Sequence, residues 1–514
     1  MPVALPEQLN IADYFLGDRI AEGRGAAVAV RTDMATFTYA DVDRLASRYG
    51  TALRALGVRR EERVFVALPD GFHYPGALFG ILKLGAVAVM INPSLPTPTL
   101  AALIDHCRPC AAVVHRDFVA GVDAACEQAR HDLRLLVIGG PGNGHATLEG
   151  LATDEPLQAA PTHRDDPAIW LFSGGTTGLP KAVVQTHGSY ANSTECYAKR
   201  GLGYHAGDIT LSVPKLYFGY ATGSNLFFPF AVGASTVLFD EHPTPEVLFD
   251  KIARHRPTVL INVPSMIAKM VDHPDAAEQD LSSLRVVTSA GEALPAPLYE
   301  RWRDTFGVEV LDGLGTAEMW HVFLSNLPGD VRPGTLGKAV PGFRVEVRDD
   351  AGRPVEPGEV GLLWVSGASR ALGYWRDLPK TAEVFRGQWV VTGDLVRQDA
   401  DGYFRYVGRN DDALKVKGKW LVPAEVESCL ATHGAVAECV VVGVLDDAGL
   451  TKPVAFVIPR ERRAGLGDEL RQFVLDRLEA YKHPREIIFV DDLPRTHLGK
   501  VDRGALKREA AQRA

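Results

Sequence analysis

The chain has 514 residues, of which 46% are hydrophobic, and its formal net charge is −9. This length suggests about two to four structural units, and the acidic balance disfavours a general nucleic-acid binder, which would usually be basic. No apolar run approaches the roughly 20 residues of a membrane span. The first residues also lack the basic and then apolar pattern of a signal peptide. We therefore expect a cytoplasmic protein that binds neither membrane nor nucleic acid.

The six cysteines are too few for a disulfide framework. Cys107 and Cys110 form a C-x-x-C pair with His106 and His115 nearby, which could also indicate a metal or redox site. A zinc site normally needs a second pair at suitable spacing, and none follows in the sequence. We therefore predict ordinary reduced thiols.

Helix-like and strand-like segments alternate along most of the chain, which favours an α/β architecture. Apolar residues recur at helical spacing over 41–56. A second helix is expected over 74–84, and an apolar run at 86–91 follows it. Short runs typical of buried strands lie at 111–114, 135–138, 168–172, 182–185, 258–261 and 285–287.

A domain boundary is predicted near 408–412, where a turn and strand at 399–407 give way to a new pattern. The later segments comprise expected strands at 438–444, 453–458 and 486–490 and an expected helix at 468–480. About 100 residues suffice for one small domain. Residues 501–514 are basic and polar, and we expect them to be loosely held. The predicted domains are therefore 1–408 and 409–514.

The most informative motif is the glycine-rich stretch 173–181, Ser-Gly-Gly-Thr-Thr-Gly-Leu-Pro-Lys. Its glycines allow a tight turn whose N–H groups converge on an anion, and its hydroxyls and Lys181 add donors and charge. It is not the standard P-loop, because Ala182 stands where a metal-binding hydroxyl would follow the lysine. We predict a polyphosphate site between two strands. A surface turn rich in Gly, Ser and Thr is the alternative.

Further motifs follow in order, and each is weak alone. They are Ser-Ala-Gly-Glu-Ala-Leu-Pro at 289–295, Leu-Asp-Gly-Leu-Gly-Thr-Ala-Glu at 311–318, Thr-Gly-Asp at 392–394, Gly408-Arg409, and Leu-Pro-Arg-Thr-His-Leu-Gly-Lys at 493–500. Together they resemble the adenylate-forming superfamily of acyl-CoA synthetases, luciferases and carrier-protein adenylation domains, from about Phe37 to Arg503. The resemblance implies an α/β fold with a large multi-layered N-terminal domain and a small, mobile α+β C-terminal domain.

The resemblance also implies a site for ATP. Glu318 would bind Mg²⁺, a hard cation that suits carboxylate and phosphate oxygens. Asp312 would face the adenine amino group. Asp394 would accept hydrogen bonds from both ribose hydroxyls, and Arg409 would support the ribose. The residues with an implied nucleotide-binding role are Ser173, Gly174, Gly175, Thr176, Thr177, Lys181, Gly291, Glu292, Ala293, Asp312, Gly313, Thr316, Asp394 and Arg409.

Lys500 is the implied catalytic residue, because a positioned ammonium would stabilise charge while a carboxylate attacks the α-phosphate. His497 and Leu498 are bulkier than the family's usual residues, but the ending Gly499-Lys500 is kept. A surface lysine in a basic tail is the alternative. The residues with an implied catalytic role are Lys500, Glu318, Thr176 and Lys181.

A second step, thioester transfer to coenzyme A after the C-terminal domain swings, is also implied. Asp411 occupies the hinge position, where a residue must absorb a large backbone change. Gly418 would line the pantetheine tunnel, which a side chain would block. The alternating lysines would either meet CoA phosphates or form a solvated strand face; they are Lys415, Lys417 and Lys419.

The segments 215–220 (Lys-Leu-Tyr-Phe-Gly-Tyr) and 319–326 (Met-Trp-His-Val-Phe-Leu-Ser-Asn) resemble those of benzoate-type CoA ligases. Gly219 stands where that subgroup often has Ala, which would leave extra room beside an aromatic ring. A structural role is the alternative for His321. Such a small pocket suits benzoate or a substituted relative, such as 2-aminobenzoate or hydroxybenzoate, rather than a fatty chain. The residues expected to border the acid are Gly219, Tyr220, Gly315, His321 and Val322.

We therefore predict an acid–thiol ligase that uses ATP, Mg²⁺ and coenzyme A to convert an aromatic carboxylate, through aryl-AMP, into aryl-CoA, AMP and pyrophosphate. The alternative is a stand-alone adenylating enzyme that loads the pantetheine thiol of a carrier protein. A non-catalytic nucleotide sensor would not need the full set of catalytic residues, and no specific residue favours a luciferase-like oxidoreductase. The sequence leaves open the ring substituents, the pathway, and whether the protein is a monomer or a homodimer.

Overall fold

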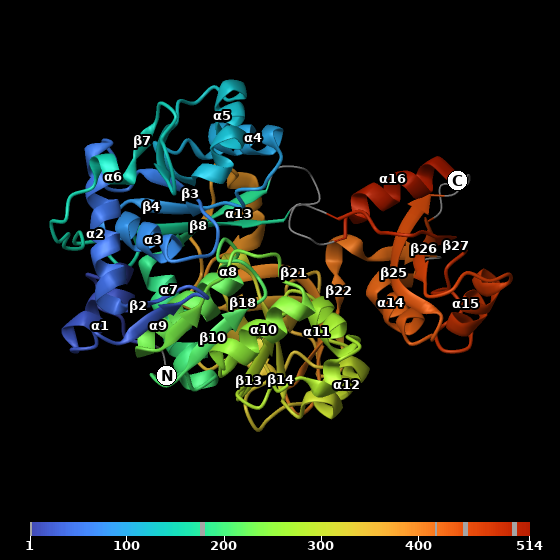
Figure 1. The fold of residues 1–514 in the computed structure, drawn as a ribbon. Coiled ribbons are helices and arrows are strands. Elements are labelled where there is room, and N and C mark those ends of the chain that lie inside the picture. Colours follow the sequence, from blue (N-terminus) through green and yellow to red (C-terminus); the bar gives the residue numbers. More distant parts are fainter. Residues whose placement is uncertain (1–2, 175–179, 417–418, 446–450, 496–500, 514) are drawn as a thin grey trace. The chain divides into compact units, whose positions relative to one another are not determined.

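The computed structural model describes residues 3–174, 180–416, 419–445, 451–495 and 501–513, without the side chains at 415, 419 and 420. The chain divides into two compact units (Figure 1). The first comprises Met1–Val345 and Val365–Val391, and the second comprises Glu346–Trp364 and Thr392–Ala514. The predicted domain division at 408/409 differs from these bounds and stays a prediction.

One sheet of the first unit has the strand order β19-β9-β8-β4-β3-β5-β6-β7. Its central strands pair in parallel, whereas β9 pairs antiparallel with both β8 and β19. The predicted strands at 111–114, 135–138, 168–172 and 182–185 are confirmed. The strands are β3 (Arg63–Ala67), β4 (Val87–Met90), β5 (Ala111–His115), β6 (Arg134–Ile138), β7 (Ala146–Thr147), β8 (Pro167–Ser173), β9 (Lys181–Thr186) and β19 (Gly373–Tyr374).

Helices cover this sheet because its strands are apolar on both faces. Phe65 and Ala67 join one buried cluster with residues of two helices that pack side by side, α4 (Thr97–Cys107) and α5 (Val119–Gln128) (Figure 1). The predicted first two helices are confirmed as α2 (Tyr39–Ala55) and α3 (His73–Lys83). A capping box starts α2, in which Thr38 Oγ1 accepts a hydrogen bond from Asp41 N at 3.1 Å.

Cys107, the last residue of α4, packs in the same buried cluster. Burial raises the pKa of its thiol to about 12 and that of Cys110 to about 11. Both thiols therefore stay protonated near neutral pH.

The second sheet has the order β16-β15-β14-β13-β12-β10-β11-β1-β2 and is parallel from β14 through to β1. Helices α10 (Pro245–His255), α11 (Pro264–Val271) and α12 (Ala296–Phe306) bury Leu248, Met266 and Trp302 against one face. The predicted strands at 258–261 and 285–287 are confirmed. The strands are β1 (Val28–Arg31), β2 (Thr36–Thr38), β10 (Ile209–Ser212), β11 (Ser235–Val237), β12 (Val259–Asn262), β13 (Val286–Ser289), β14 (Val310–Gly315), β15 (Val322–Ser325) and β16 (Lys338–Ala339).

Short helices complete the first unit. They are α1 (Asp18–Ala21), α6 (Leu148–Leu151), α7 (His187–Ser193), α8 (Gly219–Thr222), α9 (Phe228–Val232) and α13 (Leu378–Val384).

The chain passes between the two units within strands β17 (Arg344–Arg348), β18 (Val360–Ser366) and β21 (Trp389–Gln398). Their sheet has the order β17-β18-β21-β20, and β22 also pairs with β21. The other strands are β20 (Phe385–Arg386), β22 (Phe404–Arg409), β23 (Leu414–Val416), β24 (Lys419–Leu421), β25 (Val436–Leu445), β26 (Thr451–Pro459) and β27 (Glu486–Phe489).

The described residues of the second unit form the α-helices α14 (Pro423–Ala431), α15 (Leu466–Leu475) and α16 (Arg503–Arg513). The predicted helix over 468–480 is α15, which ends five residues earlier. The expectation of a loosely held C-terminal stretch is wrong, because α16 buries Leu506 and Ala510 against β25 and β26. Arg503 also donates to both carboxylate oxygens of Glu427, at 2.7 and 2.8 Å. This polar helix is therefore held by two apolar residues one helical turn apart and by the ion pair of Arg503.

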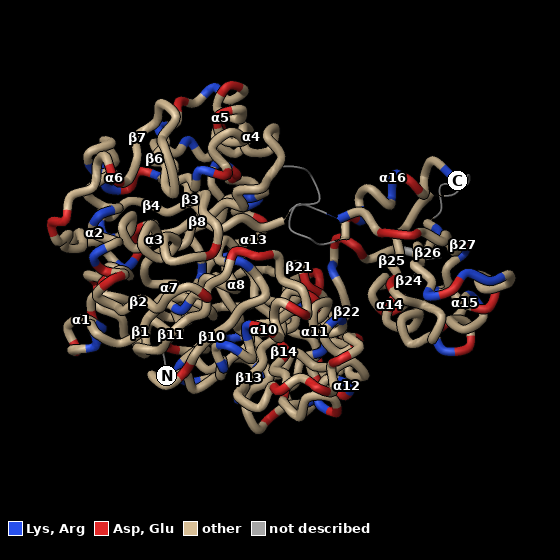
Figure 2. Tube along the Cα trace, in the orientation of Figure 1, with Lys and Arg blue, Asp and Glu red and all other residues tan. Residues whose placement is uncertain are grey.

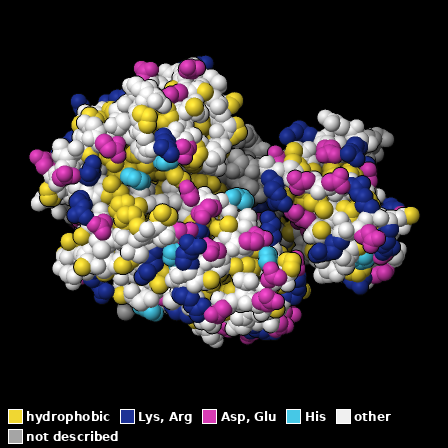
Figure 3. Space-filling model, in the orientation of Figure 1, with side chains coloured by type: hydrophobic (Ala, Val, Ile, Leu, Met, Phe, Trp, Pro, Cys, Tyr) yellow, Lys and Arg dark blue, Asp and Glu magenta, His cyan; other side chains and the backbone are white. Residues whose placement is uncertain are grey.

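Acidic and basic side chains are interspersed along both units (Figure 2), and both kinds occur on the face seen in Figure 3. Within the described residues, we find no helix with the length and apolar character needed to cross a membrane.

The first position of α7 is His187, which is completely buried and accepts a hydrogen bond at Nδ1 from Ile11 N at 3.2 Å. Burial lowers its pKa to about 4. As the pH falls below 6.5, His187 is protonated in the unfolded chain but stays neutral in the folded chain. Its titration therefore lowers the free energy of unfolding below pH 6.5.

We expect acidification from pH 7 to 5.5 to destabilise the wild type by about 1 kcal/mol more than the variant His187→Asn. The Asn Oδ1 atom can accept the same hydrogen bond but does not titrate. Urea unfolding of both proteins at the two pH values measures the difference. Equal losses would contradict a neutral buried His187.

Candidate active site

The carboxyl ends of β12, β13 and β14 bring polar side chains to one edge of the second sheet. Asn262 is in register with Ser289, and Ser289 is in register with Asp312. These three side chains are buried. Ligands of open α/β sheets bind outside the carboxyl ends of the strands, so this edge is the natural place for a site.

Asp312 is the most unusual acid at this edge. Leu294 N donates to its Oδ2 at 3.4 Å, and Asn326 Nδ2 donates to its main-chain oxygen at 3.0 Å. Within the described part of the chain, neither Asp312 Oδ1 nor Ser289 Oγ makes a hydrogen bond of normal geometry. Burial raises the pKa of Asp312 to about 7. A buried carboxylate oxygen that makes no hydrogen bond of normal geometry suits a ligand donor, such as the amino group of an adenine.

The loop after β13 carries the other residues expected to contact a base. Gly291 has φ of +93° and open space where a side chain would begin, so the backbone there requires glycine. Glu292 and Ala293 are exposed beside it. This loop forms an accessible edge next to the buried Asp312.

The glycine-rich loop begins and ends where predicted. Ser173 ends β8, Lys181 begins β9, and the two residues are in antiparallel register. Gly174 is exposed. Ser173 Oγ and Thr316 Oγ1 are buried and have no hydrogen-bond partner among the described residues. Unpartnered hydroxyls in these motifs fit a ligand rich in oxygen acceptors.

Glu318 is held through both its main chain and its side chain. Ala371 N donates to Glu318 O at 2.8 Å, and Tyr374 Oη donates to Glu318 Oε1 at 2.6 Å. Gln185 Nε2 donates to Ala317 O at 2.6 Å, which fixes the preceding residue. The half-buried carboxylate fits the role expected for Mg²⁺, which binds through one or two carboxylates together with substrate phosphates.

Tyr374 and Gln185 were not identified from the sequence. Tyr374 lies in the two-residue strand β19, which pairs with Val183 of β9, and its ring centroid is 5.5 Å from Lys181 Nζ. Neither residue belongs to a glycine-rich or charged motif, so no local pattern distinguishes them from ordinary strand residues.

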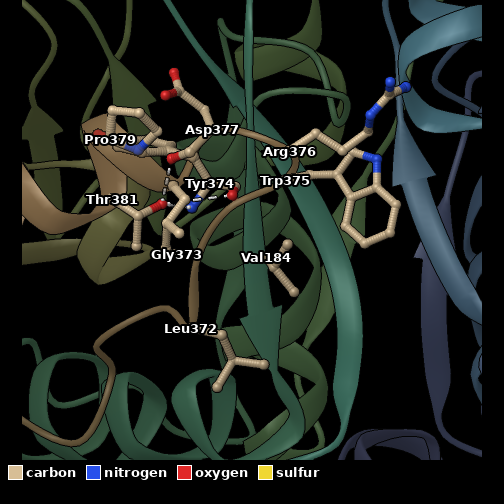
Figure 4. Close-up of a pocket in the computed structure, with 10 residues that line it drawn as sticks. Val184, Leu372, Gly373, Tyr374, Trp375, Arg376, Asp377, Pro379 and Thr381 are labelled. Atoms are coloured by element: carbon tan, nitrogen blue, oxygen red, sulfur yellow. Dashed lines mark hydrogen bonds between the residues drawn. The ribbon is translucent and has the colours of Figure 1, made fainter.

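A pocket of about 510 Å³ opens beside β19 (Figure 4). Tyr374 and Thr381 lie on its wall, and Tyr374 N donates to Thr381 Oγ1 at 3.0 Å. Gly373 is needed here, because a Cβ at this position would lie 2.7 Å from Thr381 Cγ2. Helix α13 thereby approaches β19 closely and fixes the main chain of Tyr374.

A second group of residues surrounds His321, which is buried and follows the Glu318 motif. Its Nε2 lies 3.1 Å from Ser224 Oγ and 3.2 Å from Tyr220 O. Its ring packs against Phe228, with centroids 4.7 Å apart. Burial lowers the pKa of His321 to about 3, so the ring is neutral at neutral pH. It therefore offers a polar edge and a hydrophobic face rather than a positive charge.

Tyr220 connects this aromatic group to the sheet edge. Its hydroxyl lies 2.7 Å from Thr288 Oγ1, on the strand residue that precedes Ser289. Burial raises the pKa of this phenol well above its usual value, so it stays protonated. The aromatic group and the unpartnered polar atoms thus border one another.

Trp320 has an unfavourable backbone conformation at this point, with φ of 61° and ψ of −50°. His321 N donates to Met319 O at 2.8 Å across it, which is the pattern of a γ-turn. Buried packing against Tyr190, with ring centroids 3.8 Å apart, holds the turn. Such strain is common at functional sites, where the surrounding structure enforces it.

Glycines at this site allow close packing of the chain. A Cβ at Gly315 would lie 2.6 Å from the carbonyl carbon of His321, so main-chain packing already requires glycine there. A Cβ at Gly313 would lie 2.6 Å from Leu324 O across the β14–β15 pair, and buried Val322 begins β15. At Gly219 a Cβ would lie 3.0 Å from Leu171 Cδ1. The extra room expected at Gly219 is therefore limited by the buried Leu171 side chain.

Asp70 fixes the start of the 215–220 segment, a role not foreseen from the sequence. Its two carboxylate oxygens lie 3.0 and 3.2 Å from Leu216 N. Burial raises the pKa of Asp70 to about 6. Lys215 Nζ donates to Phe239 O at 2.7 Å. These contacts position the segment that carries Gly219 and Tyr220.

The second unit contains the paired residues Asp394 and Arg409, which are in register on β21 and β22. Arg409 donates to Asp394 Oδ1 at 3.0 Å and to Thr392 O at 2.9 Å. Gly393, with φ of +76°, lies between these contacts. The exposed Asp411 follows, 3.9 Å from the Arg409 guanidinium. The pairing of Arg409 with a nearly buried acid raises the guanidinium pKa.

Several predicted residues lie outside the described residues or side chains. They are Gly175, Thr176, Thr177, Lys417, Gly418, Lys500 and the side chains of Lys415 and Lys419. Their implied roles stay predictions.

Comparison with known proteins identifies relatives over almost the whole chain. The profile of the AMP-binding enzyme family matches residues 18–375, and that of the AMP-binding enzyme C-terminal domain matches residues 425–500. The benzoate–CoA ligase of Thauera aromatica is 39% identical over 510 residues, which cover 98% of this chain and 97% of the relative.

Two further relatives are named for another aromatic acid. The anthranilate–CoA ligase of Pseudomonas aeruginosa is 33% identical and covers 87% of each chain. The crystal structure of the anthranilate CoA ligase AuaEII in complex with anthranoyl-AMP superposes with a TM-score of 0.92 at 38% identity. It covers 99% of this chain and 98% of the other.

Proposed function

Because this chain belongs to the family of AMP-binding enzymes, we propose that it is an ATP- and Mg²⁺-dependent ligase of aromatic acids and coenzyme A. The observation that carries this proposal is the 2.7 Å contact between Tyr220 and Thr288. It joins the aromatic side chains around His321 to the sheet edge that carries Asp312, whose Oδ1 makes no hydrogen bond of normal geometry among the described residues. An aromatic acid and a nucleotide would therefore lie next to each other.

In the first step a carboxylate oxygen of the acid attacks the α-phosphorus of ATP. The new O–P bond gives aryl-AMP, and pyrophosphate leaves with the electrons of the broken P–O bond. Asp312 would accept a hydrogen bond from the adenine amino group. Ser173, Lys181 and Thr316 would donate hydrogen bonds to phosphate oxygens. Bound Mg²⁺, held by Glu318 and phosphate oxygens, would supply charge neutralisation.

In the second step the sulfur of coenzyme A attacks the acyl carbon of aryl-AMP. A C–S bond forms, the acyl C–O bond breaks, AMP leaves, and the thiol proton passes to solvent. The proposed hinge at Asp411 would let the part of the chain that follows it change orientation between the steps. Loading of a carrier-protein pantetheine remains the alternative second step, and the oligomeric state stays open. We place the reaction in the cytoplasm, where both ATP and coenzyme A are available.

The proposed acids are benzoate and its substituted relatives, including 2-aminobenzoate and hydroxybenzoates. The neutral His321 ring, its aromatic neighbours and the protonated Tyr220 form a surface suited to a flat ring with one polar substituent. The names of the relatives agree with this class of acid.

Exchange of labelled pyrophosphate into ATP tests the first step directly. We expect exchange to depend on the acid and to be supported by benzoate or 2-aminobenzoate but not by a fatty acid. Exchange with fatty acids alone would contradict the proposed pocket, and no exchange with any acid would contradict the ligase activity.

We expect Gly219→Ala to lower kcat/KM for ring-substituted benzoates by about 10-fold relative to benzoate, because one extra methyl group narrows the site. The new methyl would press on Leu171 from 3.0 Å and displace it or the ring. Gly121→Ala is the matched control, since a Cβ there meets nothing within 4 Å. An equal loss for all acids would contradict the placement of Gly219 beside the substituent.

A further inference from the structure

We propose that Tyr374 is a positioning residue that orients Glu318 for Mg²⁺ and contacts the Lys181 ammonium with its ring. The inference rests on the proposed function, because it assigns a role within the ATP site. Tyr374 belongs to none of the motifs that predict that site. Its hydroxyl nevertheless donates to Glu318 Oε1 at 2.6 Å, and its ring centroid lies 5.5 Å from Lys181 Nζ.

The main chain of Tyr374 is itself fixed by two contacts. Its main chain pairs with Val183 of β9, and its N–H donates to Thr381 Oγ1 at 3.0 Å. The close approach of α13 that Gly373 permits keeps this strand in place (Figure 4). Tyr374 is buried, with 8% of the residue's surface exposed. A residue held in this way can hold another group in a fixed orientation.

The hydrogen bond from Tyr374 engages Oε1 and so determines how Glu318 presents its second oxygen. The Glu318 main chain is fixed separately, since Ala371 N donates to its carbonyl oxygen at 2.8 Å. Partners that fix a metal-binding carboxylate tune metal affinity, and their loss typically costs 10–100-fold. Tyr374 would therefore act on the metal through Glu318 and not by direct contact.

The ring of Tyr374 has a second consequence. The same side chain that donates to Glu318 also lies beside the Lys181 ammonium, 5.5 Å from the ring centroid. The ring gives the Lys181 ammonium a favourable contact of its own. The phenol satisfies one oxygen of Glu318 without neutralising it. One side chain thus contacts both the carboxylate proposed to bind the metal and the ammonium proposed to bind the phosphates.

The test is Mg²⁺ titration of ATP-analogue binding, measured by calorimetry with a non-hydrolysable α,β-methylene analogue of ATP and no acid present. For Tyr374→Phe we expect the apparent dissociation constant for Mg²⁺ to rise by about 10-fold, while binding without Mg²⁺ stays unchanged. For Tyr374→Leu, which also removes the ring beside Lys181, we expect binding without Mg²⁺ to weaken as well.

Tyr39→Phe is the matched control, because Tyr39 also donates one buried hydrogen bond of 2.6 Å, to Ala234 O. For Tyr39→Phe we expect the wild-type apparent dissociation constant for Mg²⁺. A double-mutant cycle with Glu318→Gln separates positioning from general damage. If Tyr374 acts through Glu318, then Tyr374→Phe has no further effect on the Mg²⁺ titration in the Glu318→Gln background.

A wild-type Mg²⁺ titration for Tyr374→Phe would overturn the proposal, as would an undiminished effect in the Glu318→Gln background. Because no acid or coenzyme A is present, failure of the aromatic ligase activity would leave this result intact. Acid-dependent pyrophosphate exchange tests that activity separately. Failure of the role proposed for Tyr374 and failure of the proposed ligase activity can therefore be distinguished.

Discussion

Lys500→Ala is expected to slow formation of the aryl adenylate by at least about 10²-fold, the scale of losing one strong electrostatic stabiliser. Charge builds up between the attacking carboxylate and the leaving pyrophosphate, and an ammonium stabilises it without transferring a proton. Lys500 itself lies outside the described residues, but the chain on either side is well fixed. Arg495 and Val501 form an antiparallel bridge, and Asp502 N donates to Pro494 O at 2.7 Å.

Single-turnover release of pyrophosphate measures this step. Thioester formation from presynthesised aryl-AMP measures the other, and there we expect Lys500→Ala to have a much smaller effect. Lys507→Ala is the matched control, because it removes a lysine from the basic helix α16. If both variants release pyrophosphate at the wild-type rate, Lys500 is a surface lysine and the assigned role is wrong.

Glu318→Gln is expected to lower adenylate formation by about 10²-fold at low Mg²⁺, because the amide keeps the shape of the side chain but loses the charge that binds the cation. Part of the loss should be recovered at high Mg²⁺, since phosphate oxygens still bind the ion. The rate of pyrophosphate exchange as a function of Mg²⁺ concentration measures both effects.

Glu309→Gln removes an exposed carboxylate that lies just before β14 and serves as the control. A Glu318→Gln enzyme with the wild-type Mg²⁺ dependence would contradict the assignment of this carboxylate. Recovery at high Mg²⁺ would also separate a metal defect from a folding defect, which excess metal would not repair.

The sequence predicts those features that local patterns determine. The apolar runs of three to five residues that were predicted as buried strands lie in strands of the two sheets, and most of these strands pair in parallel and bury both faces. The loop at 173–181 was found from its glycines, and its flanking strands β8 and β9 are confirmed. Asp312 was found from its motif, and the structure adds that it is buried with a raised pKa.

Contacts between distant segments could not be predicted in this way. Tyr374 and Glu318 are 56 positions apart, and the pairing of β19 with β9 and the bond from Ala371 N to Glu318 O bring the tyrosine close. Asp70 lies 146 positions from Leu216. The burial of α16 was also missed, because two apolar residues among many charged ones do not produce a clear helical pattern.

Product analysis by mass spectrometry tests the proposed ligase most directly. The wild-type protein is incubated with ATP, Mg²⁺, coenzyme A and either benzoate or 2-aminobenzoate. We expect aryl-CoA and AMP in equal amounts, with pyrophosphate released. Accumulation of aryl-AMP without aryl-CoA would contradict coenzyme A as the acceptor and favour a carrier protein, and the absence of both aryl products would contradict the proposed aromatic substrate.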